Sequence, residues 1–249
     1  MRHEITRVRR ETRRRMLTVA ATEALTPRMK RIVFTSAELH DFDSASHDDH
    51  VKLFFPAGPD GDAPRRDFTP RAFDPAQGRL IIDFALHEAG PATAWAEGAA
   101  VGDPLEIGGP RGSTIVPDDF DWYLLVGDET ALPAIGRRVE ELRSGVPVTT
   151  AAIVADEREI QTFTTGASLN PIWVLRSQCG PDDAQSLRAA LAQHPLPPGD
   201  GFVWIGAEAA VARAIRTYLV EERGHPRAWI KAAGYWMRGQ ADAHETITD

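Results

Sequence analysis

The feature that most constrains the fold is a change in the pattern of apolar residues near Val116–Asp121, where Pro117 and three aspartates interrupt the chain. Before this point, apolar and polar residues roughly alternate, as they do in half-buried β-strands. After it, short apolar segments alternate with amphipathic ones, which is typical of strands and helices in turn. A chain of 249 residues is long enough for two ordinary domains. We therefore expect one domain over 1–117 and another over 118–249.

The first half is predicted to form an antiparallel β-barrel. Its clearest strand is Arg79–His87, in which Leu80, Ile82, Phe84 and Leu86 face one way and the residues between them face the other. The other strands are expected at Met16–Ala24, Met29–Thr35 and His50–Phe55.

The second half is predicted to form an α/β domain with a parallel sheet covered on both faces. Helices are expected at Thr130–Arg143, Asp183–Gln193 and Ala207–Arg223. Strands are expected at Trp122–Gly127, Val146–Val154, Pro171–Leu175 and Gly201–Gly206.

Charge is unevenly distributed along the chain. Residues 1–15 hold seven arginines and two glutamates, a net charge of +5, which leaves −13 for the rest of a chain whose total is −8. An acidic body repels polyanions, so we expect no nucleic-acid partner. The segment Arg9–Arg15 is interpreted as a solvated arm before the first strand, although the sequence does not define its role.

Several classes of protein are excluded by composition. No apolar run approaches the roughly 20 residues that cross a bilayer, so no membrane insertion is expected. The basic N-terminus lacks the apolar core of a secretory signal, which predicts a cytoplasmic protein. The single Cys179 excludes an intrachain disulfide and a four-cysteine iron–sulfur cluster. Redox chemistry would therefore need a bound organic cofactor.

The segment Arg65–Arg71 carries three arginines within seven residues, interrupted by Phe68 and Thr69. A guanidinium suits the pyrophosphate of a flavin dinucleotide, a flat ring suits the isoalloxazine, and a hydroxyl suits the redox nitrogens. Arg66 and Phe68 would share a face of a strand. The pattern thus indicates a flavin site, and the alternative is a charged surface turn.

Two downstream segments offer further sides of such a site. Gly90-Pro91-Ala92-Thr93 reads as the first turn of a helix, where free amides bind anions. The glycine-rich loop Gly108–Gly112 includes Arg111 and allows a close backbone approach, although such glycines also serve tight turns.

The chain resembles the siderophore-interacting protein family, which comprises FAD-containing ferric-siderophore reductases related to ferredoxin reductases. The similarity covers essentially the whole chain and rests on the order and spacing of several motifs. These are Val51-Lys52-Leu53, Arg66–Arg71, Asp83–His87 with Gly90-Pro91-Ala92, Gly108–Gly112, Gly127–Pro133 and Gly234-Tyr235-Trp236.

The resemblance implies FAD as cofactor and a set of residues that hold it. The implied residues are Arg66, Phe68, Thr69, Asp83, Phe84, Leu86, His87, Gly90, Pro91, Ala92, Thr93, Thr130, Gly234, Tyr235 and Trp236. Two departures weaken the match: Phe68 stands where the family usually has a tyrosine, and Met237 where members often have an arginine. Phe68 keeps the stacking surface but loses a hydroxyl.

The resemblance also implies a ferric siderophore as substrate. Such complexes are often anionic, and Lys52, Arg111 and Arg238 match basic positions in the family that are thought to receive them. The alternative is three unrelated surface charges. No catalytic residue beyond the flavin is expected, because the electron step needs no general acid or base.

The electron donor is left open between NADH, NADPH and a ferredoxin. Gly127-Asp128-Glu129-Thr130 lies at the strand-to-helix turn where a nicotinamide reductase cradles pyrophosphate. Its two carboxylates would repel phosphate, which predicts weak or displaced nicotinamide binding. The alternative is that they stabilise the start of the helix.

No protein metal site and no nucleophile are expected. His47-Asp48-Asp49-His50 has ligand-type residues but is interpreted as a solvated loop, and no Gly-x-Ser-x-Gly motif is present. The predicted function is cytoplasmic reduction of ferric siderophores by a monomer. A siderophore-binding protein without turnover and a flavin reductase with another acceptor are the alternatives.

Overall fold

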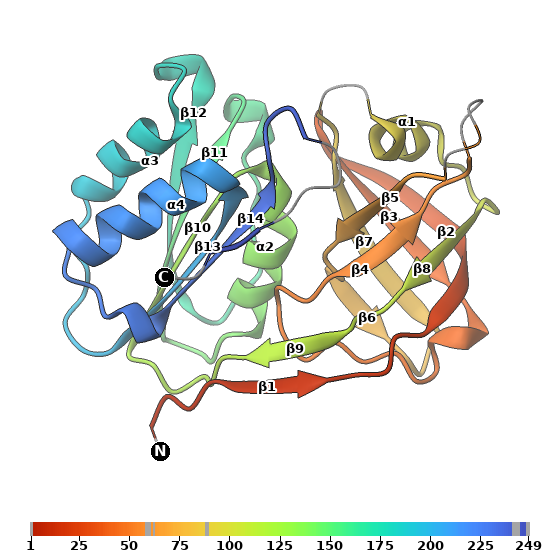
Figure 1. The fold of residues 1–249 in the computed structure, drawn as a ribbon, viewed down its shortest axis with the longest axis horizontal. Helices are drawn as coiled ribbons and strands as arrows, with labels where there is room; N and C mark the ends of the chain where they lie inside the picture. Colours follow the sequence, from red (N-terminus) through yellow and green to blue (C-terminus); the bar gives the residue numbers. More distant parts are fainter. Residues whose placement is uncertain (1, 58–60, 62, 88–89, 241–244, 248–249) are drawn as a thin grey trace. The chain divides into compact units, whose positions relative to one another are not determined.

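The computed structural model describes residues 2–57, 61, 63–87, 90–240 and 245–247. The chain divides into two compact units, Met1–Pro117 and Asp118–Asp249. Each has its own β-sheet (Figure 1).

The first unit is built on a seven-stranded sheet in the order β5-β4-β8-β2-β3-β7-β6, in which every neighbouring pair is antiparallel. The sheet curls into a half-barrel (Figure 1), so the predicted antiparallel barrel fold is confirmed. Its strands are β2 (Arg14–Thr26), β3 (Met29–Thr35), β4 (Val51–Phe54), β5 (Arg65–Phe68), β6 (Ala72–Asp74), β7 (Arg79–Ala85) and β8 (Pro104–Gly108).

Alternation along β3 and β7 builds the core of this unit. Ile32 lies opposite Ile82, and Phe34 lies opposite Leu80, with all four side chains fully buried. The short helix α1 (Pro91–Gly98) covers them through Trp95, whose ring stacks on Phe34 with centroids 6.2 Å apart. Apolar burial at these positions is the main stabilising term for the sheet.

The N-terminal arm is largely exposed, as the sequence indicated, but it is also paired with the rest of the unit, and its last residue, Arg15, is buried. Strand β1 (Thr6–Arg9) pairs with β9 (Gly112–Ile115) in a separate two-stranded ribbon. Arg10 forms an ion pair with Asp43 at 2.6 Å, and the buried Arg15 forms one with Asp41 at 2.8 Å. The sequence pattern could not reveal these acidic partners, because they are about 30 residues away.

The second unit contains a parallel sheet in the order β12-β11-β10-β13-β14, with β15 added antiparallel at one edge. The predicted α/β domain is thereby confirmed. Its elements are β10 (Trp122–Gly127), α2 (Leu132–Glu141), β11 (Pro147–Val154), β12 (Ser168–Leu175), α3 (Asp183–Ala192), β13 (Gly201–Glu208), α4 (Ala209–Thr217), β14 (Ile230–Trp236) and β15 (Glu245–Ile247).

Helices cover both faces of this sheet. Leu124 and Val126 of β10 pack in one cluster with side chains of α3 and α4. Tyr123 points to the other face, where the guanidinium of Arg138 on α2 lies 4.9 Å from its ring. All six residues of β10 are buried, as expected for a central parallel strand.

Candidate functional site

Strand β5 presents Arg66 and Phe68 at the edge of the first sheet. The ring of Phe68 packs on that of Phe84, with centroids 4.5 Å apart. The guanidinium of Arg66 has one recorded contact, a hydrogen bond from Nη1 to the carbonyl of Arg65 at 2.7 Å, and within the described residues it forms no ion pair. Arg66 is therefore a cation that the described chain leaves uncompensated.

Thr69 follows β5 and is buried. Its hydroxyl forms no hydrogen bond to any of the residues that the structure describes. A hydroxyl that the described chain leaves without a partner is a group to which a ligand can hydrogen-bond.

The corner that follows β7 brings Leu86, His87 and the start of α1 together. Gly90 is the N-cap residue of α1, and Pro91 is its first residue. The hydroxyl of Thr93 donates a hydrogen bond to the carbonyl of His87 at 3.1 Å, and the amide of Leu86 donates one to the backbone carbonyl of Arg28 at 2.8 Å. Residues 88–89 lie outside the described part of the chain. The first-turn amides of Ala92 and Thr93 are those that a helix start offers to an anion.

An aromatic cluster links these elements within the first unit. Phe84 on β7 contacts Phe68 on β5 and also Trp95 on α1, the latter with centroids 5.9 Å apart. Phe84 is buried, so only its backbone could reach a ligand. The structure thus brings Arg66, Phe68 and Thr69 together with the end of β7 and α1.

Asp83 belongs to a buried ion pair. Its carboxylate accepts two hydrogen bonds from Arg31, at 2.7 and 2.8 Å, and lies 3.7 Å from Nε of Arg71. Asp83 is 4% exposed and Arg71 is 8% exposed. The side chain predicted to hold a cofactor is thus committed to the protein, and the third arginine of the Arg65–Arg71 segment lies in the interior.

The three basic residues predicted to receive a substrate differ in their surroundings. Lys52 on β4 pairs with Asp67 on β5, with Nζ and Oδ2 3.0 Å apart. Arg111, in the loop between β8 and β9, and Arg238, after β14, are exposed. Neither guanidinium has a recorded partner among the described residues. Lys52 and Arg111 belong to the first unit, and Arg238 belongs to the second.

The acidic turn after β10 is occupied by internal hydrogen bonds. Asp128 is 2% exposed, and its Oδ1 accepts hydrogen bonds from the amide of Thr130 at 2.9 Å and from its hydroxyl at 2.6 Å. Glu129 pairs with Arg176. Burial raises the pKa of Glu129, and the guanidinium of Arg176 opposes that rise. Asp128 has the stabilising role that the sequence offered as the alternative to phosphate repulsion.

The C-terminal segment Gly234-Tyr235-Trp236 forms the end of β14. The indole nitrogen of Trp236 donates a hydrogen bond to Oδ2 of Asp128 at 2.9 Å. Tyr235 contacts Trp204 edge-to-face, with centroids 5.9 Å apart. The sequence pattern did not reveal this strand. It also could not reveal the hydrogen bond between Trp236 and Asp128, because these residues are 108 positions apart.

Gly234 lets β14 pass close to the start of α4. A methyl group at this position would lie 2.7 Å from Cβ and 2.9 Å from Cα of Ala209. We expect Gly234→Ala to lower the free energy of unfolding by about 1–3 kcal/mol, as overpacking does. Chemical denaturation would measure the change. Gly180→Ala, whose added methyl meets nothing within 4 Å, is the matched control, and equal stability of the two variants would contradict the expectation.

The His47–His50 segment is not the solvated loop that the sequence indicated. His47 and Asp49 are buried, and Asp49 accepts hydrogen bonds from the hydroxyls of Ser44 at 3.0 Å and Ser113 at 2.7 Å. Burial raises the pKa of Asp49. Among the described residues, no group of three or more His, Cys, Asp or Glu side chains could hold a metal ion.

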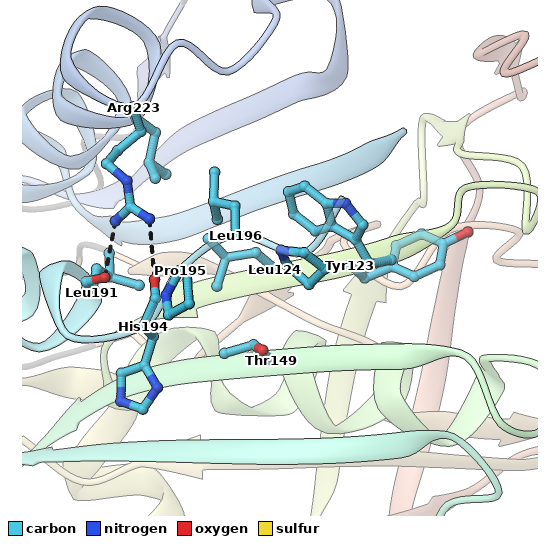
Figure 2. Close-up of a pocket in the computed structure, with 11 residues that line it drawn as sticks. Tyr123, Leu124, Thr149, Leu191, His194, Pro195, Leu196 and Arg223 are labelled. Carbon is cyan, nitrogen blue, oxygen red and sulfur yellow. Dashed lines mark hydrogen bonds between the residues drawn. The ribbon is translucent and has the colours of Figure 1, made fainter. Parts of the chain in front are cut away.

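A small pocket lies at the amino ends of β10 and β11 (Figure 2). Leu124, Thr149 and Leu196 line it, and Arg223 donates hydrogen bonds to the carbonyls of Leu191 at 3.0 Å and His194 at 3.1 Å. Its volume of about 20 Å³ has room for about one water molecule. It is too small for an organic ligand, and ligands of such sheets bind at the opposite, carboxyl ends of the strands.

Comparison with known proteins identifies the family of this chain. Residues 120–239 match the family described as siderophore-interacting protein, and residues 18–63 and 57–114 match the siderophore-interacting FAD-binding domain. The NADPH-dependent ferric-chelate reductase of Escherichia coli K12 is 34% identical, over 92% of this chain and 95% of its own. The chain belongs to the siderophore-interacting protein family.

Two further similar proteins extend the comparison. The ferric vibriobactin reductase of Vibrio cholerae is 28% identical, over 91% of this chain and 90% of its own. The crystal structure of a siderophore utilization protein from T. fusca superimposes with a TM-score of 0.88 at 35% identity, covering 96% of this chain and 98% of that one. In the part of the present chain that the structure describes, no helix is long and apolar enough to cross a membrane.

The residues of the first unit fit the FAD that its domain family implies. Among the described residues, Arg66 offers a cation without a counter-ion, Thr69 offers a hydroxyl, and α1 offers first-turn amides. Phe68 supplies an aromatic surface beside them. A dinucleotide needs these kinds of group for its pyrophosphate and ring.

Proposed function

We propose that this chain reduces the iron of ferric siderophores in the cytoplasm, with FAD as its bound cofactor. The coarser assignment is that of a flavin-dependent oxidoreductase, and it follows from the FAD-binding domain match and from named ferric reductases that align with nearly the whole chain. The observation that carries the cofactor part of the proposal is the uncompensated guanidinium of Arg66 on the same strand as the ring of Phe68, because these groups suit a flavin dinucleotide. The siderophore substrate is supported by the family and by the named ferric reductases.

Each group in the first unit has a distinct part in holding the cofactor. Arg66 and the amides of Ala92 and Thr93 bind pyrophosphate, while Thr69 and Phe68 bind the ring system. The proposed contacts of Asp83, Phe84 and Leu86 come from backbone atoms, because Asp83 is ion-paired and Phe84 is buried. Thr130 and Gly234–Trp236 complete the set of residues that we propose to contact the cofactor.

Bound FAD supplies two-electron acceptance from a hydride donor and one-electron delivery to iron. The protein binds and orients the cofactor and the substrate, and it excludes water. The electron step itself requires no acid or base. Lys52, Arg111 and Arg238 attract the anionic ferric complex, against the overall charge of −8. Ferrous iron binds hard oxygen ligands more weakly than ferric iron does, so the siderophore releases it.

The electron donor that we propose to test first is NADPH. The relative from E. coli is named NADPH-dependent. In this chain Asp128 is buried and Glu129 is paired with Arg176, so the turn after β10 is less repulsive to phosphate than its sequence suggests. NADH and a ferredoxin are the other donors to be tested.

The decisive experiment is an assay of ferrous iron release. Purified protein, FAD and each donor in turn would be mixed with catecholate and hydroxamate ferric siderophores, and a ferrous chelator would report the product. We expect donor-dependent release that needs FAD. Tight siderophore binding without release would instead indicate a sequestering protein.

A second arm of the assay separates the remaining alternative. Lys52→Ala with Arg238→Ala is expected to raise the KM for an anionic ferric siderophore at least tenfold, since each removed charge contributes about 1 kcal/mol or more to binding. Unchanged turnover of siderophores by this variant would favour a flavin reductase with an unrelated acceptor. The oligomeric state that we propose, a monomer, can be checked by light scattering on the same sample.

A further inference from the structure

The carboxylate of Asp128 receives four hydrogen bonds. Oδ1 accepts from the amide and the hydroxyl of Thr130, and Oδ2 accepts from the amide of Glu208 and from the indole nitrogen of Trp236, both at 2.9 Å. Asp128 is 2% exposed. A carboxylate removed from water costs free energy unless such donors replace its hydration, so the four bonds are what allow an acidic residue here.

This arrangement requires an aspartate rather than an asparagine. An ionised carboxylate only accepts hydrogen bonds and offers two oxygens, whereas an asparagine amide has one accepting oxygen and an NH₂ that would face donors. Asparagine could therefore satisfy at most the donors on one side of Asp128. The acid is matched to its surroundings by hydrogen-bonding capacity.

The four donors tie together the carboxyl ends of three strands. Asp128 directly follows β10, Glu208 is the last residue of β13, and Trp236 is the last residue of β14. These strands are neighbours in the sheet. A single buried side chain thus fixes where the tail leaves the sheet, and it orients the indole ring through its N–H group.

Glu208 adds a second tie to the same tail. Its Oε2 accepts hydrogen bonds from the amides of Ala210 and Val211 at the start of α4, at 2.7 and 3.2 Å. Its Oε1 lies 3.4 Å from the amide of Arg238. The tail is thus held by the side chain of Trp236 and by the backbone of Arg238.

We propose that Asp128 is a positioning residue that orients Trp236, and with it the segment Gly234–Arg238, for contact with the flavin. The inference rests on the proposed function, because that function assigns Gly234–Trp236 to the cofactor. It gives the acidic turn a part in FAD binding that differs from repulsion of a dinucleotide phosphate.

The test compares Trp236→Phe, Asp128→Asn and the double variant with wild type. Trp236→Phe keeps an aromatic ring and deletes the donor to Asp128. The control is Trp173→Phe on β12, because Trp173 is half-buried and its indole has no recorded partner among the described residues. FAD affinity of the apoprotein would be measured by fluorescence titration, and the visible circular dichroism of bound FAD at saturation.

We expect Trp236→Phe and Asp128→Asn each to weaken FAD binding about fivefold to twentyfold, which is less than the loss of a direct hydrogen bond between a charged group and FAD, because the lost bond lies within the protein. The double variant should be weaker than Asp128→Asn by much less than that factor, since the two residues act as one unit. At saturating FAD, the visible circular dichroism of each variant should differ from wild type, which lost stability alone would not cause.

Two outcomes would overturn the inference, and they are distinguishable. If wild type binds FAD and Trp236→Phe matches it in affinity and in circular dichroism, the hydrogen bond only stabilises the fold. If wild type does not bind FAD, the proposed function itself is wrong. Should Asp128→Asn fail to fold, the comparison of Trp236→Phe with Trp173→Phe still decides.

Discussion

Asp83→Ala is expected to lower the free energy of unfolding of the apoprotein by about 3–5 kcal/mol, because it breaks a buried ion pair in which the carboxylate of Asp83 contacts both Arg31 and Arg71. Arg71 is 8% exposed and lies beside Asp83, so its charge cannot reach water without movement of β7 or of the segment after β5. Arg31, the other partner, is partly exposed and can be hydrated. Urea denaturation without FAD would measure the loss.

Glu23→Ala is the matched control for this variant. Glu23 lies opposite Arg31 in the register of β2 and β3, is exposed, and forms no recorded ion pair within the described residues. Its removal should change stability by less than about 0.5 kcal/mol. If Asp83→Ala were equally mild in the apoprotein and weakened only FAD binding, Asp83 would be a cofactor ligand and the ion pair would be of little consequence.

Arg66→Ala is expected to raise the dissociation constant of FAD about tenfold to a hundredfold, the range for loss of a hydrogen bond to a charged group. The stability of the apoprotein should hardly change, because the guanidinium contacts only the carbonyl of Arg65 within the described chain. Titration of apoprotein with FAD, at low and moderate salt, would give the affinity, and the loss should shrink as salt screens the charge.

Arg79→Ala is the control for nonspecific charge loss. Arg79 is an exposed residue at the start of β7, and its side chain has no recorded partner among the described residues. Its variant should bind FAD as wild type does. Equal FAD affinities for the Arg66 and Arg79 variants would indicate that the Arg65–Arg71 segment is a charged surface turn and not a flavin site.

Local patterns predicted the elements that bury one clear face. The alternation in Arg79–His87 gave β7, and the apolar run Trp122–Gly127 gave β10 with the same bounds that the structure has. Strand β14 was missed, because Ile230–Trp236 contains small residues and one lysine without clean alternation. Its strand character comes from pairing with β13 rather than from its own residues.

The candidate site shows the same limit for side chains. The sequence identifies Arg66 and Asp128 as residues with suitable chemistry, but their partners depend on strand register and on contacts between distant segments. Asp83 meets Arg31 because β3 and β7 pair in that register. Asp128 meets Trp236 because β10 and β14 flank β13 in the sheet. Neither pairing leaves a local mark on the sequence.

The ion pair between Lys52 and Asp67 has a consequence for which anions can bind. Where Lys52 receives an anionic complex, as proposed above, Asp67 already lies 3.0 Å from it and acts as a tethered competitor. A ligand with one negative charge gains little by displacing a carboxylate of equal charge. A multiply charged ligand gains more. The pair is therefore expected to favour multiply charged anions over singly charged ones, rather than to attract all anions alike.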